Sequence, residues 1–318
     1  KVIWVMDEQE MIETAWNKEY NLYTYNAAAD SYVAASRLGP TQLRRTHNSS
    51  WSTLWQAAIS YDNTFSGHHV SGLMLYEEAH NVGDNLWAQR NFSIPLPYLF
   101  AGDSKEQVGM ANANGLSESA SKGLIGKFNY DYKGRYLAEF SFRYDGSSKF
   151  PSDNRWGFFP GVSVGWNIME ERFWKDSKIS GVISNLKPRL SYGVNGNVNG
   201  IGNFDVYGAY SQVGAKTYGG STAFYNSGLV NTGLRWEQSQ SFEAGLDIGF
   251  LNNRLSFILD YYNRTTKDLL TKQALPGYTG FTEIMTNMGT LRNYGFEMEV
   301  RANILNNPKG LTWDVTAN

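Results

Sequence analysis

The acidic pair Glu297 and Glu299 is the part of this sequence closest in type and spacing to a catalytic site. A β-strand would place both carboxyl groups on one face, because side chains alternate between faces. Two carboxylates can hydrolyse a glycosidic bond, but only when they flank that bond in a shaped cleft. Nothing in the sequence marks such a cleft, and no G-x-S-x-G sequence supplies a serine nucleophile. We therefore predict that the chain is not an enzyme and has no catalytic residues.

The adjacent histidines His68 and His69 suggest a metal site at first sight. On a strand, however, neighbouring side chains point to opposite faces and cannot share an ion. The chain has no Cys, which excludes a thiolate zinc site, a disulfide and a cysteine nucleophile. The run NGNVNGIGN at 195–203 lacks the G-x-G-x-x-G order of a phosphate loop, so we interpret it as the start of a flexible loop. We predict no metal and no cofactor.

The composition limits the possible partners. The 318 residues include 28 Lys and Arg against 30 Asp and Glu, which gives a formal net charge of −2. Nucleic-acid binding needs a clustered basic surface, so we predict no nucleic-acid partner. Charged residues make up 18%, below the roughly 25% usual in soluble domains, while aromatic residues reach 15%. The fold must be inferred from the hydrophobic periodicity.

Neither end of the sequence carries a targeting signal. No apolar run approaches the roughly 20 residues that a membrane helix needs, and the first apolar cluster, Val2–Met6, is too short for a signal peptide. The chain starts at Lys1 and stops at Asn318 within an alternating pattern. We interpret it as an internal piece of a longer polypeptide.

Almost all of the periodicity in the sequence has a period of two, which indicates β-strands. Helical spacing is confined to Asp7–Tyr20 and to a short piece at Met169–Asp176. The pattern predicts about ten strands of roughly 7 to 12 residues. They are Trp55–Tyr61, Val70–Glu77, Leu124–Tyr132, Tyr136–Asp145, Pro160–Ile168, Leu186–Val194, Ser241–Phe250, Leu255–Asn263, Tyr294–Ile304 and Leu311–Ala317.

The two faces of these strands differ in a way that favours a membrane barrel. The polar face of a soluble sandwich meets water and is rich in Lys and Glu. Here the polar face is rich in Gly, Ser and Asn with charges of both signs, and the apolar face is rich in aromatic residues near the strand ends. Strands of a transmembrane barrel have this pattern, with interfacial aromatic girdles. We assign Trp87, Trp156 and Trp166 to such girdles.

The connections between the predicted strands alternate between short and long, with the 17-residue piece Met169–Asn185 as the one exception. Outer-membrane barrels do the same, because short turns face the periplasm and long loops face outside. Two turns also satisfy the parity that keeps the apolar faces together. An odd loop is supplied by Lys133-Gly134-Arg135, and an even one by a two-residue turn at Asn252-Asn253. The sequence therefore predicts an all-β, antiparallel transmembrane β-barrel segment with long extracellular loops.

Several sequence strings together resemble the SusC/RagA family of TonB-dependent outer-membrane transporters of Bacteroidetes-type bacteria. The resemblance covers roughly residues 50–318, and its motifs are specific in their order and spacing rather than one by one. The strings are NYDYKGRYL at 129–137, FRYDGSSKF at 142–150, NRWGFFP at 154–160, LKPRLSYG at 186–193 and NYGFE at 293–297.

The resemblance implies a 22-stranded barrel with an N-terminal plug in the bacterial outer membrane, embedded in outer-membrane lipid. It implies import of an oligosaccharide or peptide, driven by the inner-membrane proton gradient through the TonB complex. That complex would contact an N-terminal region that these residues lack. It also implies a SusD-like surface lipoprotein as the partner. About ten strands would form only part of such a wall. We assign residues 51–318 to this partial barrel and residues 1–50 to a poorly matched segment of loop or short helix.

In such a transporter the polar face of the wall would line the lumen and contact substrate or plug. The candidate lumen residues are Lys127, Glu139, Arg143, Asp145, Arg189, Glu243, Asp247, Glu297, Glu299 and Arg301. The simpler alternative is ion pairing between strands, since the expected register places Asn129 opposite Glu139 with Lys127 diagonal to Glu139. Aromatic residues of the long loops would bind the ligand or the partner, or pack within the loops. They are Tyr207, Tyr210, Tyr218, Phe224, Tyr225, Tyr278 and Phe281.

Two other functions remain open from the sequence. One is a passive outer-membrane porin or a barrel enzyme that shares only the barrel pattern. The other is a surface β-rich glycan-binding protein, in which the aromatic faces would pack against each other inside the molecule. The alternation of loop lengths argues against the second of these.

Overall fold

The computed structural model of the chain describes residues 1–94, 96–111, 116–208, 210–219, 221–226, 228–306 and 310–318. It divides into two compact units. The first unit comprises Lys1–Ile3, Trp55–Glu78 and Ala120–Asn318, and the second comprises Trp4–Leu54 and Ala79–Ser119. Strands dominate both units. No helix in the described part of the chain has the length and apolarity needed to cross a membrane.

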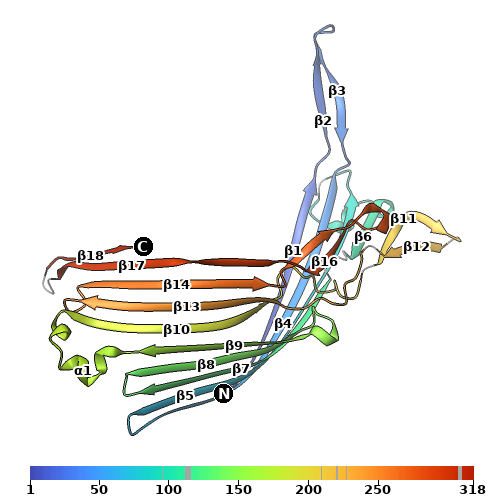
Figure 1. Cartoon of the computed structure of the whole chain (residues 1–318). Helices are drawn as coiled ribbons and strands as arrows, with labels where there is room; N and C mark the ends of the chain where they lie inside the picture. Colours follow the sequence, from blue (N-terminus) through green and yellow to red (C-terminus); the bar gives the residue numbers. More distant parts are fainter. Residues whose placement is uncertain (95, 112–115, 209, 220, 227, 307–309) are drawn as a thin grey trace. The chain divides into compact units, whose positions relative to one another are not determined.

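The first unit contains an antiparallel wall in which each strand pairs with the next wall strand along the chain (Figure 1). The order in this part of the sheet is β7-β8-β9-β10-β13-β14-β17-β18. The bounds are β7 Ser117–Tyr132, β8 Tyr136–Ser147, β9 Trp156–Trp166, β10 Ile183–Asn197, β13 Glu237–Phe250, β14 Leu255–Lys267, β17 Thr290–Asn306 and β18 Thr312–Ala317. Two longer strands, β4 (Gln42–Phe65) and β5 (His68–Asn91), precede β7 in the sheet order and run through both units.

These strands confirm the ten segments predicted from the sequence. In the wall, directly paired residues share a face, so that Phe128, Phe140, Val162, Tyr192 and Phe242 form one continuous row across β7, β8, β9, β10 and β13. All five are exposed. Such a row of exposed apolar side chains is the pattern of a lipid-facing barrel wall, and it excludes the sandwich, in which the aromatic faces would be covered.

Aromatic residues gather toward both ends of the apolar face. At the end with the tight turns, Tyr132 stacks on Tyr136 and Tyr136 on Trp166, with ring centroids 6.5 and 6.3 Å apart. At the other end Tyr144 stacks on Trp156 at 5.0 Å. Eight residues of β8 separate Tyr136 from Tyr144, which is about 27 Å along the strand. This spacing fits the apolar band of an outer-membrane barrel, about 25 Å tall.

The tight turns have the expected parity. The loop between β7 and β8 is the predicted Lys133-Gly134-Arg135, with positive φ at Lys133 and Gly134. The loop between β13 and β14 has the even length expected. Its four residues, Leu251–Arg254, are those left between the two predicted strands, because pairing stops at Phe250 and Leu255. The predicted turn residues Asn252 and Asn253 lie at its centre. Three successive positive φ angles, at 251, 252 and 253, form this turn.

The connection between β9 and β10 contains the short helix expected at Met169–Asp176. It consists of the one-turn segment η4 (Ile168–Glu170), the helix α1 (Arg172–Lys175) and the one-turn segment η5 (Lys178–Gly181). This connection lies at the same end of the wall as the tight turns (Figure 1). It spans residues 167–182 and is longer than the connection at 148–155 between β8 and β9, so the alternation of short and long connections is interrupted here.

The long connections carry folded structure that the sequence pattern missed. Between β10 and β13 lies the hairpin β11 (Tyr210–Tyr218) and β12 (Ser221–Asn226), and between β14 and β17 lies the hairpin β15 (Leu270–Ala274) and β16 (Glu283–Asn287). The segment η6 (Gly277–Thr279) joins β15 to β16, and η3 (Ser152–Asn154) lies between β8 and β9. The run at 195–203 is not a loop throughout, because residues 195–197 continue β10 and Ile201 is buried.

The second unit contains most of β1 (Val2–Asn17), parts of β4 and β5, and β6 (Gln107–Ala111), which pairs with β5. It also contains the separate hairpin β2 (Tyr20–Asn26) and β3 (Ser31–Leu38), and the segments η1 (Leu99–Ala101) and η2 (Ser104–Glu106). Its buried apolar residues are Leu43 and Phe92, and Trp16 packs edge-on against Phe92 at 5.2 Å.

The helix predicted over Asp7–Tyr20 is wrong, and so is the loop or short helix predicted for residues 1–50. Strand β1 occupies most of that helix segment and pairs with β4. The residues of 7–20 are good helix formers, but intrinsic propensity is a weak preference that pairing with an existing strand overrides. The division of the chain at residue 50 stays a prediction.

Candidate functional site

All ten candidate lumen residues lie on the polar face of the wall, as their register positions require. The predicted contact between β7 and β8 is confirmed. Asn129 pairs with Glu139 in the ladder, and Lys127 Nζ lies 3.0 Å from Glu139 Oε2. Both side chains of this ion pair remain well exposed, so it contributes at most about 1 kcal/mol. The pair leaves both charges able to interact with a ligand from the lumen side.

A second ion pair joins two positions of the same strand. Arg143 Nε lies 2.9 Å from Asp145 Oδ2, and its Nη2 lies 3.2 Å from Oδ1, so the guanidinium holds the carboxylate with two hydrogen bonds. Glu299 and Arg301 on β17 form a similar pair two residues apart. With the pair Arg189–Asp247, eight of the ten candidates are ion-paired with another candidate. Two of these four pairs, Lys127–Glu139 and Arg189–Asp247, join different strands, as the simpler alternative expects.

Arg189 connects three strands of the polar face through ion pairs. Its Nε lies 3.1 Å from Asp247 Oδ1 and its Nη2 2.8 Å from Asp260 Oδ2, so that one guanidinium from β10 bridges β13 and β14. Gly245 lies between Arg189 and Asp260 in the register. A Cβ atom there would come within 2.6 Å of Arg189 Cζ and 2.5 Å of Asp260 Oδ1. The glycine therefore leaves the space through which the arginine reaches the second carboxylate.

Two hollows border Arg189 on the polar face. One, of about 430 Å³, is open over β13, β14 and β17. It brings the candidates Arg189, Glu243 and Glu297 together with residues that the prediction left out, namely Asp260, Tyr262, Arg264 and Asn293. Asp260, Tyr262 and Arg264 alternate along β14, and Asn293 lies on the same face of β17. The period-two pattern would therefore have identified all four. The other, of about 400 Å³, includes Glu139, Lys187 and Glu243. These hollows can accept hydrogen-bonding groups of either charge.

The long loops enclose a further hollow of about 630 Å³. Two of the predicted loop aromatics, Tyr225 and Phe281, line it, together with Phe204. Its polar lining includes Lys272, whose Nζ lies 2.5 Å from Glu283 Oε1. The hydrogen bond to Glu283, reinforced by the charges of Glu283 and Asp205, raises the pKa of Lys272. Aromatic faces beside a fixed cation and carboxylates can contact either sugar rings or a peptide.

The other predicted loop aromatics lie elsewhere. Tyr207, Tyr210, Phe224 and Tyr278 are exposed and do not line this hollow, and Tyr278 is 90% exposed. The side chain of Tyr218 lies outside the described residues. Sequence alone could not separate these groups, because all of them are aromatic residues in long loops.

The base of the loops is fastened to the wall by a small buried core. Phe150, Ile201 and Leu234 are buried together, and Trp236, Leu270 and Met285 pack against them. These residues come from three different connections, β8–β9, β10–β13 and β14–β17, which explains why no local periodicity revealed the core. We call Phe150, Ile201 and Leu234 the loop core.

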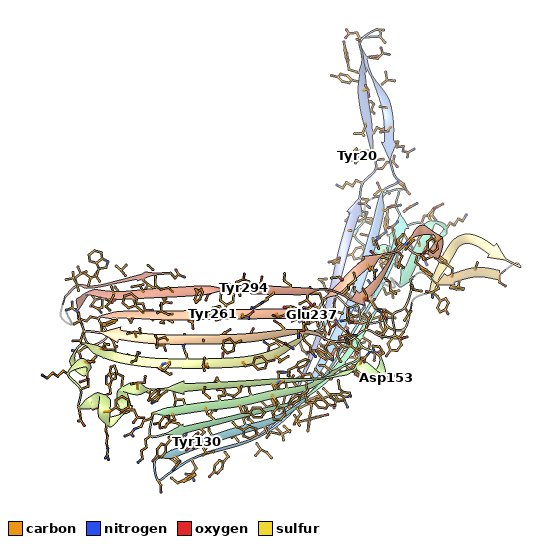
Figure 2. The ribbon with its side chains drawn as sticks, in the orientation of Figure 1. Tyr20, Tyr130, Asp153, Glu237, Tyr261 and Tyr294 are labelled. Carbon is orange, nitrogen blue, oxygen red and sulfur yellow. The ribbon has the colours of Figure 1, made fainter. Side chains whose placement is uncertain are left out.

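Polar contacts complete this attachment. Glu237, labelled at the start of β13 in Figure 2, accepts hydrogen bonds from Asn197 Nδ2 at 3.0 Å and from the backbone N–H of Leu270 at 3.1 Å. Asn287 Nδ2 donates to the backbone carbonyls of Arg235 and Asp268 at 2.7 and 2.9 Å. The two long loops are therefore tied both to the wall and to each other.

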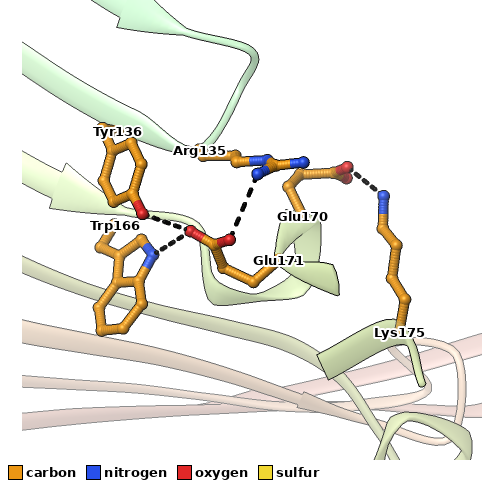
Figure 3. Close-up of polar contacts among 6 residues, drawn as sticks. All are labelled: Arg135, Tyr136, Trp166, Glu170, Glu171 and Lys175. Carbon is orange, nitrogen blue, oxygen red and sulfur yellow. Dashed lines mark hydrogen bonds and ion pairs between the residues drawn. The ribbon is translucent and has the colours of Figure 1, made fainter. Parts of the chain in front are cut away.

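At the opposite end of the wall a polar cluster surrounds Glu171 (Figure 3). Tyr136 Oη donates to Glu171 Oε1 at 2.6 Å, Trp166 Nε1 donates to the same oxygen at 3.3 Å, and Arg135 Nη1 lies 3.3 Å from Oε2. Glu171 is only 8% exposed. The hydrogen bond from Tyr136, with those from Trp166 and the charge of Arg135, holds the pKa of Glu171 below its usual value despite the opposing effect of burial.

We expect this cluster to release the β9–β10 connection in acid. A carboxylate whose folded-state pKa is lowered stabilises the fold above its unfolded pKa, about 4.3, and this stabilisation disappears as the pH falls through the folded value. The protection of residues 167–182 from hydrogen exchange, relative to the intrinsic rate at each pH, should therefore fall below about pH 4. In Glu171→Gln this protection should be lower at neutral pH and nearly independent of acid. Glu170→Gln, which removes only the exposed contact with Lys175, should behave like the wild type. An unchanged acid response in Glu171→Gln would contradict this assignment.

The two histidines of the sequence motif have different partners. His68 Nδ1 lies 2.9 Å from Tyr130 Oη, whereas His69 Nε2 lies 3.2 Å from Asp62 Oδ1. The adjacent imidazoles therefore point apart, as predicted for a strand. Within the described ranges, no group of three or more His, Cys, Asp or Glu side chains is arranged to hold a metal ion.

Comparison with known proteins identifies related sequences. Residues 11–318 match the family described as TonB dependent receptor-like, beta-barrel. The TonB-dependent receptor SusC of Bacteroides thetaiotaomicron is 38% identical over 222 residues, which cover 67% of this chain and 21% of SusC. The TonB-dependent receptor P3 of Formosa agariphila is 31% identical over 274 residues, which cover 84% of this chain and 26% of that receptor. The chain thus spans about a fifth to a quarter of the length of these relatives.

Solved structures give the same assignment. A structure of the RagAB peptide importer in its open-open state superposes with a TM-score of 0.79 at 25% identity, covering 99% of this chain and 32% of the other. A structure of the RagAB peptide transporter gives a TM-score of 0.75 at 27% identity, covering 87% and 30%.

Proposed function

The chain belongs to the TonB-dependent receptor β-barrel family, and from this premise we propose that it forms part of the wall and outer loops of an outer-membrane importer. The cargo is a nutrient, either an oligosaccharide or a peptide, that enters from the side of the long loops. A surface lipoprotein of the SusD type covers that entrance, and the TonB complex supplies the energy. The cargo is bound and moved without chemical change.

One observation carries this proposal. The wall has an exposed apolar face and a charged face, and its long loops are folded around a hollow lined by aromatic and charged side chains. A passive pore needs no such hollow, because it binds its solutes weakly. The ion pairs of the polar face favour a hydrated lumen. The hollows around Arg189 offer hydrogen-bond donors and acceptors along the path of the cargo. The similarity to the RagAB peptide importer supports peptide as one cargo class.

Uptake by cells that produce the full-length receptor tests the proposal. Cells are supplied with oligosaccharide or peptide mixtures, and depletion of each from the medium is followed. Depletion should stop when the proton gradient is collapsed or the TonB complex is deleted. Uptake that continues without either would show a passive pore and overturn the proposal. Co-purification from detergent should also recover a lipoprotein in about equal amounts.

Variants of the hollow test the role of the loops. We expect Phe281→Ala to lower uptake about tenfold at limiting cargo, because one lost aromatic contact weakens binding by roughly 1 to 1.5 kcal/mol. Tyr278→Ala is the matched control, since Tyr278 belongs to the same loop but does not line the hollow. An equal loss of uptake in both variants, or a loss in neither, would show that the hollow does not bind the cargo. Neither result would contradict the proposal that the protein is an importer.

A further inference from the structure

Among the described ladders between consecutive wall strands from β7 to β18, the shortest joins β9 and β10, and we call it the seam. Their ladder runs only from Gly161 and Gly193 to Gly165 and Arg189. On their other sides both strands are paired over their full length, β9 with β8 and β10 with β13. Each end of the short ladder adjoins a proline, Pro160 or Pro188, which cannot donate a backbone hydrogen bond. The wall is therefore held together by only five residue pairs at this seam.

A hollow of about 470 Å³ lies at this seam, toward the end of the wall with the tight turns. Its lining is almost wholly apolar and includes Tyr130, Ala138, Val164, Trp166, Pro188 and Leu190. Most of these side chains belong to the exposed apolar face of the wall by their register. The hollow thus interrupts a surface that faces lipid, and in a membrane only an apolar chain can fill it without cost.

The mouth of this hollow adjoins the β9–β10 connection. Trp166 and Tyr136 both line the hollow and both donate to Glu171 in that connection. The Trp166 ring also contacts the Phe173 ring, with centroids 6.5 Å apart. The cluster in Figure 3 therefore fixes the connection directly beside the hollow.

The connection itself has the composition of a segment at a membrane interface. Phe173 and Ile179 are exposed apolar residues, and Arg172 and Lys178 are exposed cations beside them in the sequence. Neither cation forms an ion pair with any residue that the structure describes. Apolar side chains next to free cations favour contact with a lipid surface bearing negative charge.

We propose that the β9–β10 seam is a binding site for a glycerophospholipid, with one acyl chain in the apolar hollow and the phosphate against Arg172 and Lys178. The tight turns of such barrels face the periplasm, so the lipid comes from the inner leaflet of the outer membrane rather than from lipopolysaccharide. The acyl chain supplies the packing that the short ladder lacks. This inference depends on the membrane orientation of the wall and is independent of the cargo.

Native mass spectrometry of the full-length receptor in detergent, titrated with phosphatidylglycerol, tests the site. The wild type should retain one molecule more tightly than the rest. Ala138→Phe fills the hollow from the apolar face, and we expect a loss of about tenfold in affinity, the effect of removing roughly two methylene groups from contact. Ala302→Phe is the matched control. Ala302 also lies on the apolar face of the wall, but on β17, and it does not line this hollow.

A second variant tests the headgroup without touching the wall. Arg172→Gln with Lys178→Gln should weaken phosphatidylglycerol several-fold and leave diacylglycerol of the same chain length unaffected. Lys133→Gln, a cation of another tight turn, should change neither. Equal retention by Ala138→Phe and the wild type, or equal losses in Ala138→Phe and Ala302→Phe, would overturn the proposal. So would preferential retention of lipopolysaccharide over phosphatidylglycerol by the wild type.

Discussion

Replacing Val162 with arginine is expected to prevent the wall from forming stably in lipid. Val162 lies in the middle of β9 on the apolar face, between Phe140 and Tyr192, and it is 48% exposed. An arginine on the lipid face near the bilayer midplane destabilises a barrel by about 2–4 kcal/mol. The measurement is the urea midpoint of the full-length receptor in lipid vesicles, followed by the heat-dependent shift of the folded band on gels.

The neighbouring residue gives a matched control for this substitution. Ser163 lies on the opposite, polar face, paired with Glu139 and Ser191. Ser163→Arg places the same charge in a wet environment beside a carboxylate, so its urea midpoint should stay near that of the wild type. If both variants lost the same stability, the assignment of the two faces would be wrong. A loss of stability in Ser163→Arg alone would mean that the polar and apolar faces are assigned the wrong way round.

Leu234→Ala should loosen both long loops at once. Leu234 is 1% exposed in the loop core, and truncating a buried leucine costs about 2–5 kcal/mol. Because the loop core joins the connection before β13 to the hairpin β15–β16, hydrogen exchange should rise in both segments while the wall strands keep their protection. Limited proteolysis of the intact receptor should show new cleavage within residues 198–236 and 268–289.

A leucine of the same connection serves as the control. Leu229 is 43% exposed, so Leu229→Ala removes little buried surface and should leave exchange unchanged. If Leu234→Ala affected only its own connection, the two loops would not share one core. Cargo uptake should fall in Leu234→Ala together with loop protection, since the hollow is built on this core.

Most of the wall could be predicted from the sequence, because the face on which each side chain lies depends only on its position along its own strand. Side chains alternate with a period of two, and a membrane on one side with water on the other makes the two faces chemically distinct. The contact between Lys127 and Glu139 followed from that alternation and from the length of one turn. The same reasoning would have found Asp260 and Tyr262, which alternate on the polar face of β14.

The remaining features depend on contacts between distant segments. Phe150, Ile201 and Leu234 meet only after two connections have folded, and none of them belongs to a periodic run. Glu171 becomes a buried carboxylate because Tyr136 and Trp166 converge on it from β8 and β9. The helix expected over Asp7–Tyr20 failed for the same reason, since pairing with β4 decided that segment rather than its own propensity.

The order of strands in the wall has a consequence for how the protein assembles. From β7 to β18, every strand pairs with the next wall strand along the chain. Folding can therefore proceed as successive hairpins, each closing a loop before the next strand arrives. Closing residues 198–236 costs roughly 2 kcal/mol more than closing residues 251–254, because loop entropy grows only with the logarithm of length. Long outer loops thus add little to the entropic barrier of assembly, and their sequences can lengthen or change while the hairpins beneath them keep forming in the same order.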